Sequence, residues 1–190
     1  MLLFLTVSEG VPDRDRRIDE LILKMARGDV SAMGELYELI KGSVYGYALS
    51  KTRDKDLAED ITHDTFVRIY KYASHYKPSG KPMAWIISVE INIIRRHFNT
   101  SKRIVLVEDV EREPDEGGID AMINNELIRD LLRHLKEDER EIVVLHAVTG
   151  LKHREIAKLL DLPLSTVLSK YNRAIKKLQA LVKERGDLYE

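Results

Sequence analysis

The stretch from Thr149 to Leu178 constrains the fold of this 190-residue chain more than any other part of the sequence. Its apolar residues recur at the spacing of an amphipathic helix in two runs, which a short segment separates. The runs are Leu151, Ile156, Ala157, Leu159 and Leu160, and then Val167, Leu168, Tyr171, Ala174, Ile175 and Leu178. Pro163 stands just before the second run, where a missing backbone N–H costs little, and Ser165 and Thr166 can cap or open the second helix. The pattern predicts two short helices joined by a tight turn.

Two helices joined in this way are typical of a helix-turn-helix, which places its second helix in the major groove of DNA. The second helix begins with hydroxyl side chains and continues with cations, and both suit phosphate oxygens and base acceptors. The candidate DNA-contacting residues are Ser165, Thr166, Ser169, Lys170, Arg173, Lys176 and Lys177. The alternative is a helical hairpin whose basic face is only solvated.

Charge is segregated along the chain, although the formal net charge is only -1. Residues 152–185 carry nine Lys or Arg against three acids, whereas residues 108–120 carry seven acids and one base. Residues 104–121 include Pro114, Gly117 and Gly118 and are typical of a flexible acidic linker. A basic end and an acidic middle indicate a DNA-contacting module on a linker that DNA repels.

Several classes of function are disfavoured by what the sequence lacks. There is no cysteine, which excludes disulfides and thiolate metal sites and is compatible with a reducing cytoplasm. The six histidines are scattered without metal-ligand spacing, and no glycine-rich phosphate loop or nucleophile motif is present. The apolar start, MLLFLTV, is too short to span a bilayer and lacks a basic flank. We therefore expect a cytoplasmic protein that is not an enzyme, with no metal, cofactor, small-molecule substrate or membrane insertion.

The remaining sequence predicts helices almost throughout. Residues 56–73 carry an apolar stripe with acids on the other side, residues 74–82 are a loop by their Pro, Gly and Ser content, and a largely buried helix follows over about 83–98. The only short strand candidate is IVLV, residues 104–107. The prediction is an all-α chain of two small helical domains joined by a flexible acidic linker, the C-terminal one a helix-turn-helix. Its parts are a poorly ordered leader (1–16), a first domain (17–103), the linker (104–121) and a second domain (122–190).

Two separated blocks of the sequence together resemble a known family. One runs over residues 29–72 and continues from Trp85 to Asn92, and the other runs from about Leu131 to Leu181. Both resemble a bacterial RNA polymerase sigma factor of the extracytoplasmic-function (ECF) group: the first block is similar to the group's domain two and the second to its domain four. The resemblance implies a promoter-specificity subunit that binds core RNA polymerase and directs initiation at the −10 and −35 elements of a restricted gene set. It also implies an anti-sigma protein as a partner.

The resemblance assigns a role to each block. The helix over 56–73 would dock on the clamp helices of the polymerase through Glu59, Asp60, His63, Asp64, Phe66 and Arg68. The loop and the helix after it would open the −10 element through Tyr76, Trp85, Asn92, Arg95 and Arg96, with Tyr72 and His97 beside them. Tyr72 and Trp85 lie in apolar helical contexts, which favours core packing over base stacking. Domain four would read the −35 element as duplex and sit on the polymerase flap.

The sequence departs from the family pattern at several positions. His63 stands where the family usually has glutamine, Leu168 where lysine or arginine is common, and Ser88 and Ile91 where arginines are favoured. The helix that would open DNA is therefore less basic in its middle, and one phosphate contact of the recognition helix is missing at Leu168.

Two other functions share part of this pattern. A helix-turn-helix transcriptional regulator with an N-terminal sensing or dimerisation domain explains residues 149–178 but not the helix, loop and helix over 56–98. A protein-binding helical adaptor without DNA contact predicts that Lys170 and Arg173 are dispensable. The regulator predicts no stoichiometric association with core polymerase, which distinguishes it from a sigma factor. The adaptor predicts that alanine at these two cations leaves function intact, whereas a sigma factor would lose promoter binding.

Overall fold

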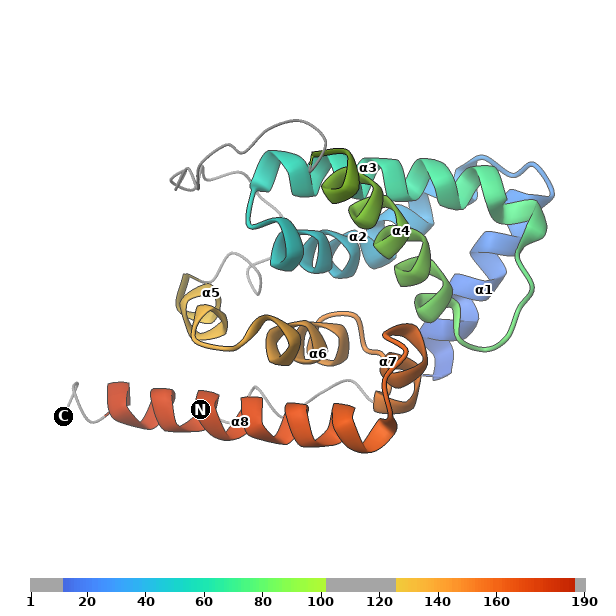
Figure 1. Cartoon of the computed structure of the whole chain (residues 1–190). Coiled ribbons are helices and arrows are strands. Elements are labelled where there is room, and N and C mark those ends of the chain that lie inside the picture. The colour runs from blue at the N-terminus through green and yellow to red at the C-terminus, as the bar shows by residue number, and fades with distance from the viewer. Residues whose placement is uncertain (1–11, 102–125, 187–190) are drawn as a thin grey trace. The chain divides into compact units, whose positions relative to one another are not determined.

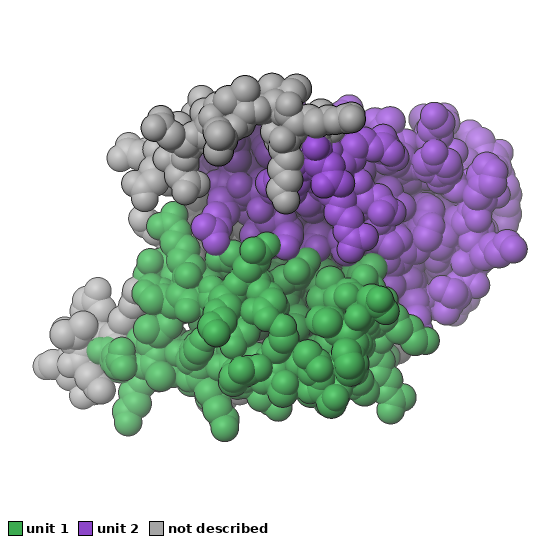
Figure 2. Space-filling model, in the orientation of Figure 1, with its two compact units in different colours: residues 1–7, 117–190 green, residues 8–116 purple. Residues whose placement is uncertain are grey.

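The computed structural model describes residues 12–101 and 126–186. These fall into two compact units, residues 12–101 and residues 126–186, which Figure 2 draws in different colours. All regular elements of the described ranges are helices (Figure 1), which confirms the predicted all-α class. The first eleven residues of the predicted leader, the acidic linker and the strand candidate at 104–107 lie outside the described residues. No helix within the described ranges has both the length and the apolar character that crossing a bilayer requires.

The first unit consists of four long helices and one short helical turn (Figure 1). They are α1 (Pro12–Ala26), α2 (Ser31–Thr52), α3 (Lys55–Tyr72), the 3-10 turn η1 (Ala73–His75) and α4 (Pro82–Ser101). The assignment of residues 12–16 to a poorly ordered leader was wrong, because α1 begins at Pro12. Proline suits the first helical position, and Asp13 and Asp15 favour the positive end of the helix dipole. Arg14 then donates to the Ser43 hydroxyl of α2 at 3.0 Å, which ties the first turn of α1 to its neighbour.

Only two residues join α2 to α3. Arg53 adopts the left-handed conformation, with φ 56°, and its N–H donates to the Leu49 carbonyl at 2.9 Å. Asp54 then caps α3, because its carboxylate accepts from the Leu57 N–H at 3.1 Å. The junction is short, so α2 and α3 pack side by side, and α3 presents one long face away from the core.

The core of the first unit follows the predicted periodicity. Ala58, Ile61 and Ile69 of α3 are fully buried, as the apolar stripe predicted. The middle of α4 is buried nearly all round, through Met83, Ile86, Ile87, Ile91, Ile93 and Ile94. Glu90 lies in the same segment with 0% exposure, and neither carboxyl oxygen has a hydrogen-bond partner among the described residues. A carboxyl group in such a place costs free energy, since no hydrogen bond from the described residues replaces its lost hydration.

The second unit contains α5 (Glu126–Arg133), α6 (Glu137–Ala147), α7 (His153–Leu159) and α8 (Leu164–Gly186). Leu135, Val143 and Ala174 form part of its core, with Leu132, Tyr171 and Leu178 packed against them. Residues Ile142, Leu145, Leu151, Ile156 and Val167 are also buried. The long helix α8 thus lies across α6 and α7, and its other side faces solvent.

Candidate nucleic-acid interface

The turn between α7 and α8 has the tight geometry that the sequence predicted. Asp161 adopts the left-handed conformation, with φ 53°, and the Leu162 N–H donates to the Ala157 carbonyl at 2.9 Å. The Pro163 carbonyl accepts from the N–H groups of Thr166 and Val167 at 3.0 and 3.1 Å. Pro163 therefore stands just before α8 and begins its hydrogen-bond ladder. Ser165 and Thr166 lie in the first turn of the helix that follows.

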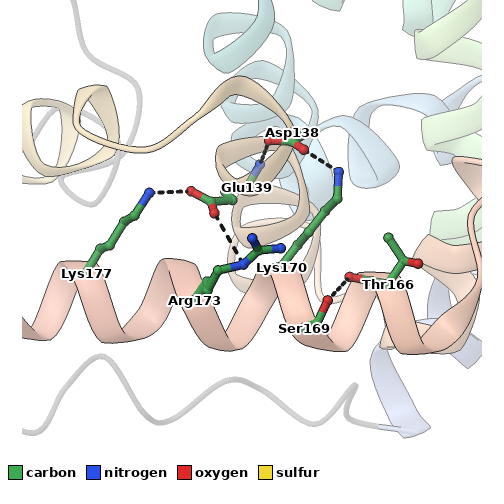
Figure 3. A network of polar contacts seen from close by, with 7 residues as sticks. All are labelled: Asp138, Glu139, Thr166, Ser169, Lys170, Arg173 and Lys177. Atoms are coloured by element: carbon green, nitrogen blue, oxygen red, sulfur yellow. Dashed lines mark hydrogen bonds and ion pairs between the residues drawn. The ribbon is translucent and has the colours of Figure 1, made fainter.

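The seven candidate DNA-contacting residues fall into two rows along α8. The outward row is Ser165, Ser169 and Lys176, all exposed at the three- to four-residue and seven-residue spacing of one helical face. The lateral row is Thr166, Lys170, Arg173 and Lys177, which lies on the side nearer α6 (Figure 3). Ser169 donates its hydroxyl proton to the Thr166 carbonyl at 3.1 Å, so its oxygen is left to accept from a donor outside the helix.

Two acids in the first turn of α6 contact the cations of the lateral row (Figure 3). Lys170 donates through Nζ to Oδ2 of Asp138. Glu139 accepts from Lys177 Nζ on Oε2 at 2.9 Å, and its Oε1 lies 3.8 Å from Arg173 Nε. These cations lower the pKa of both carboxyl groups, chiefly through the hydrogen bonds from Lys170 to Asp138 and from Lys177 to Glu139. Both acids are therefore ionised at neutral pH.

Sequence reasoning missed one exposed position on α8, Asn172, and the two acids on α6. Asn172 is exposed next to Ser169 and Lys176, and an asparagine amide can bond an adenine edge with two hydrogen bonds. Leu168 is 39% exposed. Strict application of the 3.6-residue period from Ser165 would have placed Asn172 in the outward row. The acids of α6 gave no local signal, because Asp138 and Lys170 are 32 residues apart in sequence.

Two histidines and a tyrosine pack where α6, α7 and α8 meet. The rings of His146 and His153 stack, and Tyr171 of α8 meets them edge-on at centroid distances of 5.1 and 4.6 Å. His146 donates through Nδ1 to the Leu151 carbonyl at 2.8 Å. His153 Nε2 is buried without a hydrogen-bond partner among the described residues, and burial followed by the neighbouring His146 lowers the pKa of His153. No group of three or more potential metal ligands gathers anywhere in the described ranges.

In the first unit, the structure separates the candidates for the −10 element into exposed and packed residues. Asn92, Arg95 and Arg96 are exposed on the C-terminal half of α4. Tyr76 is only 7% exposed, and its hydroxyl donates to Asp19 of α1, so its ring cannot offer a face to a base as expected. Trp85 is half-buried and packs on Tyr76 with a centroid distance of 4.7 Å.

Tyr72 behaves in the opposite way. Core packing was favoured for this residue, yet it is 44% exposed and its ring lies 6.3 Å from that of His75. The reason is its position at the last residue of α3, where the chain turns into η1 and the side chain no longer faces the core. Tyr72 is therefore an accessible aromatic ring in the region where the −10 contacts were expected.

The outer face of α3 carries most of the residues expected to bind polymerase. Glu59, Asp60, His63 and Asp64 are exposed, and Arg68 is half-buried. The expectation that Phe66 contacts polymerase was wrong. Its side chain is 2% exposed and its ring packs against that of Tyr37 at a centroid distance of 4.9 Å, so it belongs to the core beneath this face. The sequence missed Val67 and Tyr70, which are 48% and 43% exposed on the same helix. The face therefore combines acids with exposed apolar groups, a mixture found at protein interfaces.

Two protein-family models match the chain. The model described as Sigma-70 region 2 matches residues 36–104, and the model described as Sigma-70, region 4 matches residues 125–178. Each covers one of the two compact units in large part. The two matches together span more than half of the chain and occur in the order that the resemblance required.

Curated relatives and solved structures give the same picture. The ECF RNA polymerase sigma factor BldN of Streptomyces coelicolor is 26% identical over 175 residues, which are 87% of this chain and 66% of BldN, just under two thirds of its length. The ECF RNA polymerase sigma factor SigM of Bacillus subtilis is 26% identical over 155 residues, 77% of this chain and 93% of SigM. The fold is shared with the sigma factor RpoE of Bartonella quintana, solved with the anti-sigma factor NepR (TM-score 0.63, 22% identity, 81% and 98% of the two chains). It is shared as well with CnrH, solved with the cytosolic domain of CnrY (TM-score 0.63, 24% identity, 88% and 98%).

Proposed function

Because this chain belongs to the sigma-70 family of RNA polymerase sigma factors, in its extracytoplasmic-function group, we propose that its two helical units act as the promoter-binding parts of one specificity subunit. Sigma factors are initiation factors and not enzymes, so we assign RNA synthesis to the core polymerase. The observation that carries the proposal is the presence of region 2 and region 4 on one chain, in that order, each on its own compact unit. With its start moved to Pro12, where α1 begins, the first unit up to residue 103 would serve as sigma domain two, residues 104–121 as the linker and 122–190 as domain four.

We assign −35 recognition to α8. The outward row of Ser165, Ser169 and Lys176 would face base edges in the major groove, with Asn172 beside it. The lateral row of Thr166, Lys170, Arg173 and Lys177 would lie along the phosphates. This division is supported by the exposure of the outward row and by the position of the lateral row at the edge of the helix.

We assign core-polymerase binding to the exposed face of α3. Glu59, Asp60, His63 and Asp64 supply its polar part, and Val67 and Tyr70 supply apolar area that sequence reasoning had not included. Interface energy concentrates in a few aromatic and apolar residues surrounded by polar ones. Arg68 would contribute at the edge of the face, and Phe66 would hold it in shape from the core.

We assign opening of the −10 element to the region where α3, η1 and α4 meet. Arg95 and Arg96 supply cations for the backbone, Asn92 an amide for a base edge, and Trp85 and Tyr72 aromatic surface for unstacked bases. Tyr76 would instead anchor the loop to α1. An anti-sigma protein is a proposed partner, since the RpoE structure that shares this fold was solved with one. The proposed place of action is the cytoplasm, where core polymerase and promoter DNA are found.

Run-off transcription tests the proposal directly. Purified core polymerase is mixed with the full chain and with genomic DNA fragments, and new transcript starts are mapped with and without the chain. The proposal expects new starts that share two sequence elements, together with stoichiometric association of the chain with the core polymerase. A transcriptional regulator predicts no such association, and an adaptor predicts that Lys170→Ala with Arg173→Ala leaves function intact. Absence of both association and new starts would refute the proposal.

A further inference from the structure

The carboxylate of Glu139 occupies an unusual position for a charged group. Its side chain is only 3% exposed, although it lies in the first turn of α6 beside the recognition helix. A buried charge is tolerated only where partners compensate it. Each of its two oxygens faces a different cation of α8: Oε2 accepts from Lys177 Nζ at 2.9 Å, and Oε1 lies 3.8 Å from Arg173 Nε (Figure 3).

The two cations use this carboxylate differently. Lys177 reaches it with the ammonium group itself, so the charged end of Lys177 is directed at α6. Arg173 reaches it only through Nε, and a guanidinium has further N–H donors on its two terminal nitrogens. The Arg173 side chain is also 62% exposed, against 43% for Lys177. At 3.8 Å this contact is an ion pair, so it attracts the guanidinium towards α6 and leaves the N–H donors of Arg173 available to another acceptor.

We propose that Glu139 is a positioning residue of the DNA-binding surface, which holds the Arg173 guanidinium ready for a phosphate and keeps Lys177 as its own counter-ion. The inference rests on the proposed function and deepens it: within the lateral row, Arg173 contacts the DNA backbone and Lys177 serves the protein. A planar guanidinium held at Nε can meet a phosphate with two parallel hydrogen bonds. Ordering it in the free protein lowers the entropy cost of binding.

Asp138 supplies a matched control because it is the adjacent residue and carries the same charge. Its side chain is 49% exposed, and it holds Lys170, not Arg173. Removing either acid takes one negative charge from the same helical turn and so reduces the general repulsion of DNA. If both acids only repel DNA, Asp138→Asn and Glu139→Gln will both tighten binding. If Glu139 positions Arg173, Glu139→Gln will weaken DNA binding, whereas Asp138→Asn will not.

The experiment measures the affinity of reconstituted holoenzyme for a promoter fragment that the wild-type holoenzyme transcribes, at several salt concentrations. Glu139→Gln and Glu139→Asp should each weaken binding about fivefold, the scale of one net hydrogen bond. Glu139→Asp is informative because it keeps the charge and withdraws the carboxylate from both Arg173 and Lys177. Asp138→Asn should bind at least as tightly as wild type.

The same substitutions in an Arg173→Ala background separate positioning from a purely structural effect. Positioning through Arg173 predicts that once Arg173 is removed Glu139→Asp, which keeps the charge, has no further effect, and that Glu139→Gln no longer weakens binding. Thermal unfolding of each variant shows whether the second unit stays folded during the assay. Equal losses of affinity in both backgrounds, or tighter binding by Glu139→Gln while Arg173 is present, would overturn the inference.

The outcome is separable from that of the proposed function. If the wild-type chain directs no transcription with core polymerase, the promoter assignment fails. The same variants are then compared, as free full-length chains, on a short random-sequence duplex. Opposite effects of the two neighbouring acids on that duplex would still support the role of Glu139, and matching effects would refute it.

Discussion

The imidazole rings of His146 and His153 stack with their centroids 4.2 Å apart and their planes 27° from parallel. His146 belongs to α6 and His153 begins α7, and both rings touch Tyr171 of α8. Two stacked imidazoles are compatible with close packing only while they do not both carry charge. Protonation of His153 would place a charge at this junction, so the attachment of the recognition helix to α6 and α7 depends on the protonation state of that residue.

The first prediction concerns the pH dependence of the second unit. The pKa of His153 is lowered in the folded protein, first by burial and then by His146. The unfolded chain then binds a proton at higher pH than the folded one, so this contribution to stability is complete above about pH 6.5. It is lost as the pH falls from there toward the lowered pKa. NMR titration of the histidine C–H signals should show His153 titrating below the ordinary value.

His153→Gln provides the comparison for this effect. The free energy of unfolding of the second unit should depend less on pH between about 5 and 7 in this variant than in wild type. Amide exchange of α8 measures the difference, after correction for the intrinsic pH dependence of exchange. If the unfolding free energy of His153→Gln falls with decreasing pH as steeply as that of wild type, the effect belongs to other groups.

The second prediction concerns Glu90. Burial raises the pKa of this carboxyl group well above its ordinary value, and the backbone at Ala48 offsets the shift only in part, without closing a full hydrogen bond. A folded-state pKa above the unfolded one means that the contribution to stability is complete below about pH 4.3 and is lost as the pH rises toward the folded pKa. Glu90→Met has a similar volume and no charge, and it should raise the free energy of unfolding at pH 7 by about 1–3 kcal/mol.

Trp85 is the single tryptophan of the chain and lies in the same unit, so its fluorescence during urea unfolding measures this change. Glu38→Met is the control, because Glu38 is an exposed acid of the same unit whose carboxylate accepts from Lys41 at 2.7 Å. It should change stability by less than about 0.5 kcal/mol. A loss of stability in Glu90→Met would show that the carboxyl group is satisfied in solution.

The third prediction separates the two tyrosines at the end of α3. Tyr76→Phe removes the hydroxyl that bonds Asp19 and should destabilise the first unit by about 1–2 kcal/mol, with little effect on promoter opening. Tyr72→Ala removes an exposed ring and should slow open-complex formation while leaving stability nearly unchanged. Permanganate reactivity of thymines at the start site measures opening. Normal opening by Tyr72→Ala would remove this ring from the proposed site.

The fourth prediction compares two neighbouring lysines of α8. Lys176 is in the outward row proposed to face the bases, so Lys176→Ala should weaken binding to the promoter by about 1–3 kcal/mol and relax its sequence preference, without loss of stability. Lys177→Ala withdraws the hydrogen bond from the buried Glu139 carboxylate and should cost on the order of 1–3 kcal/mol of unfolding free energy. Thermal unfolding and binding at several salt concentrations distinguish the two. A fall in stability of equal size in both variants would contradict this division of roles.

The fifth prediction tests the face of α3. Val67→Glu places a charge among the exposed apolar groups and should weaken association with core polymerase about tenfold or more. Val30→Glu is the matched control, because Val30 is also an exposed valine of the first unit, at 65%, but lies outside α3. Association is measured by titration of labelled chain with core polymerase. Equal effects of the two substitutions would place the binding face elsewhere.

Sequence periodicity predicted the helices well because helix burial follows a local rule. The stripe of Ala58, Ile61 and Ile69 and the apolar middle of α4 are buried as expected. The start of α1 was missed because Pro12 was interpreted as part of a disordered leader, whereas proline is favoured at a first helical position. The left-handed residues Arg53 and Asp161, which set the two tight junctions, have no distinctive sequence signal.

The details of the candidate site were harder to predict because they depend on packing between distant segments. Tyr76 is an aromatic residue flanked by polar ones, which resembles an exposed contact, yet it bonds Asp19 of α1. Phe66 lies between Thr65 and Val67, and its ring packs on Tyr37 of α2. Tyr72 is exposed because α3 ends there. The acids of α6 and the cations of α8 meet only after the second unit has folded, so no local pattern could have paired them.

Asp138 and Glu139 of α6 contact cations of α8, and these contacts also limit how promoter preference can be engineered. A graft of α8 alone into a related scaffold would carry the residues proposed to face the bases, but Arg173 would lose the contact with Glu139 that is proposed to orient it. Transplanting residues 137–139 together with the helix should preserve both. The smallest exchangeable element of this DNA reader is thus a pair of helices that are distant in sequence.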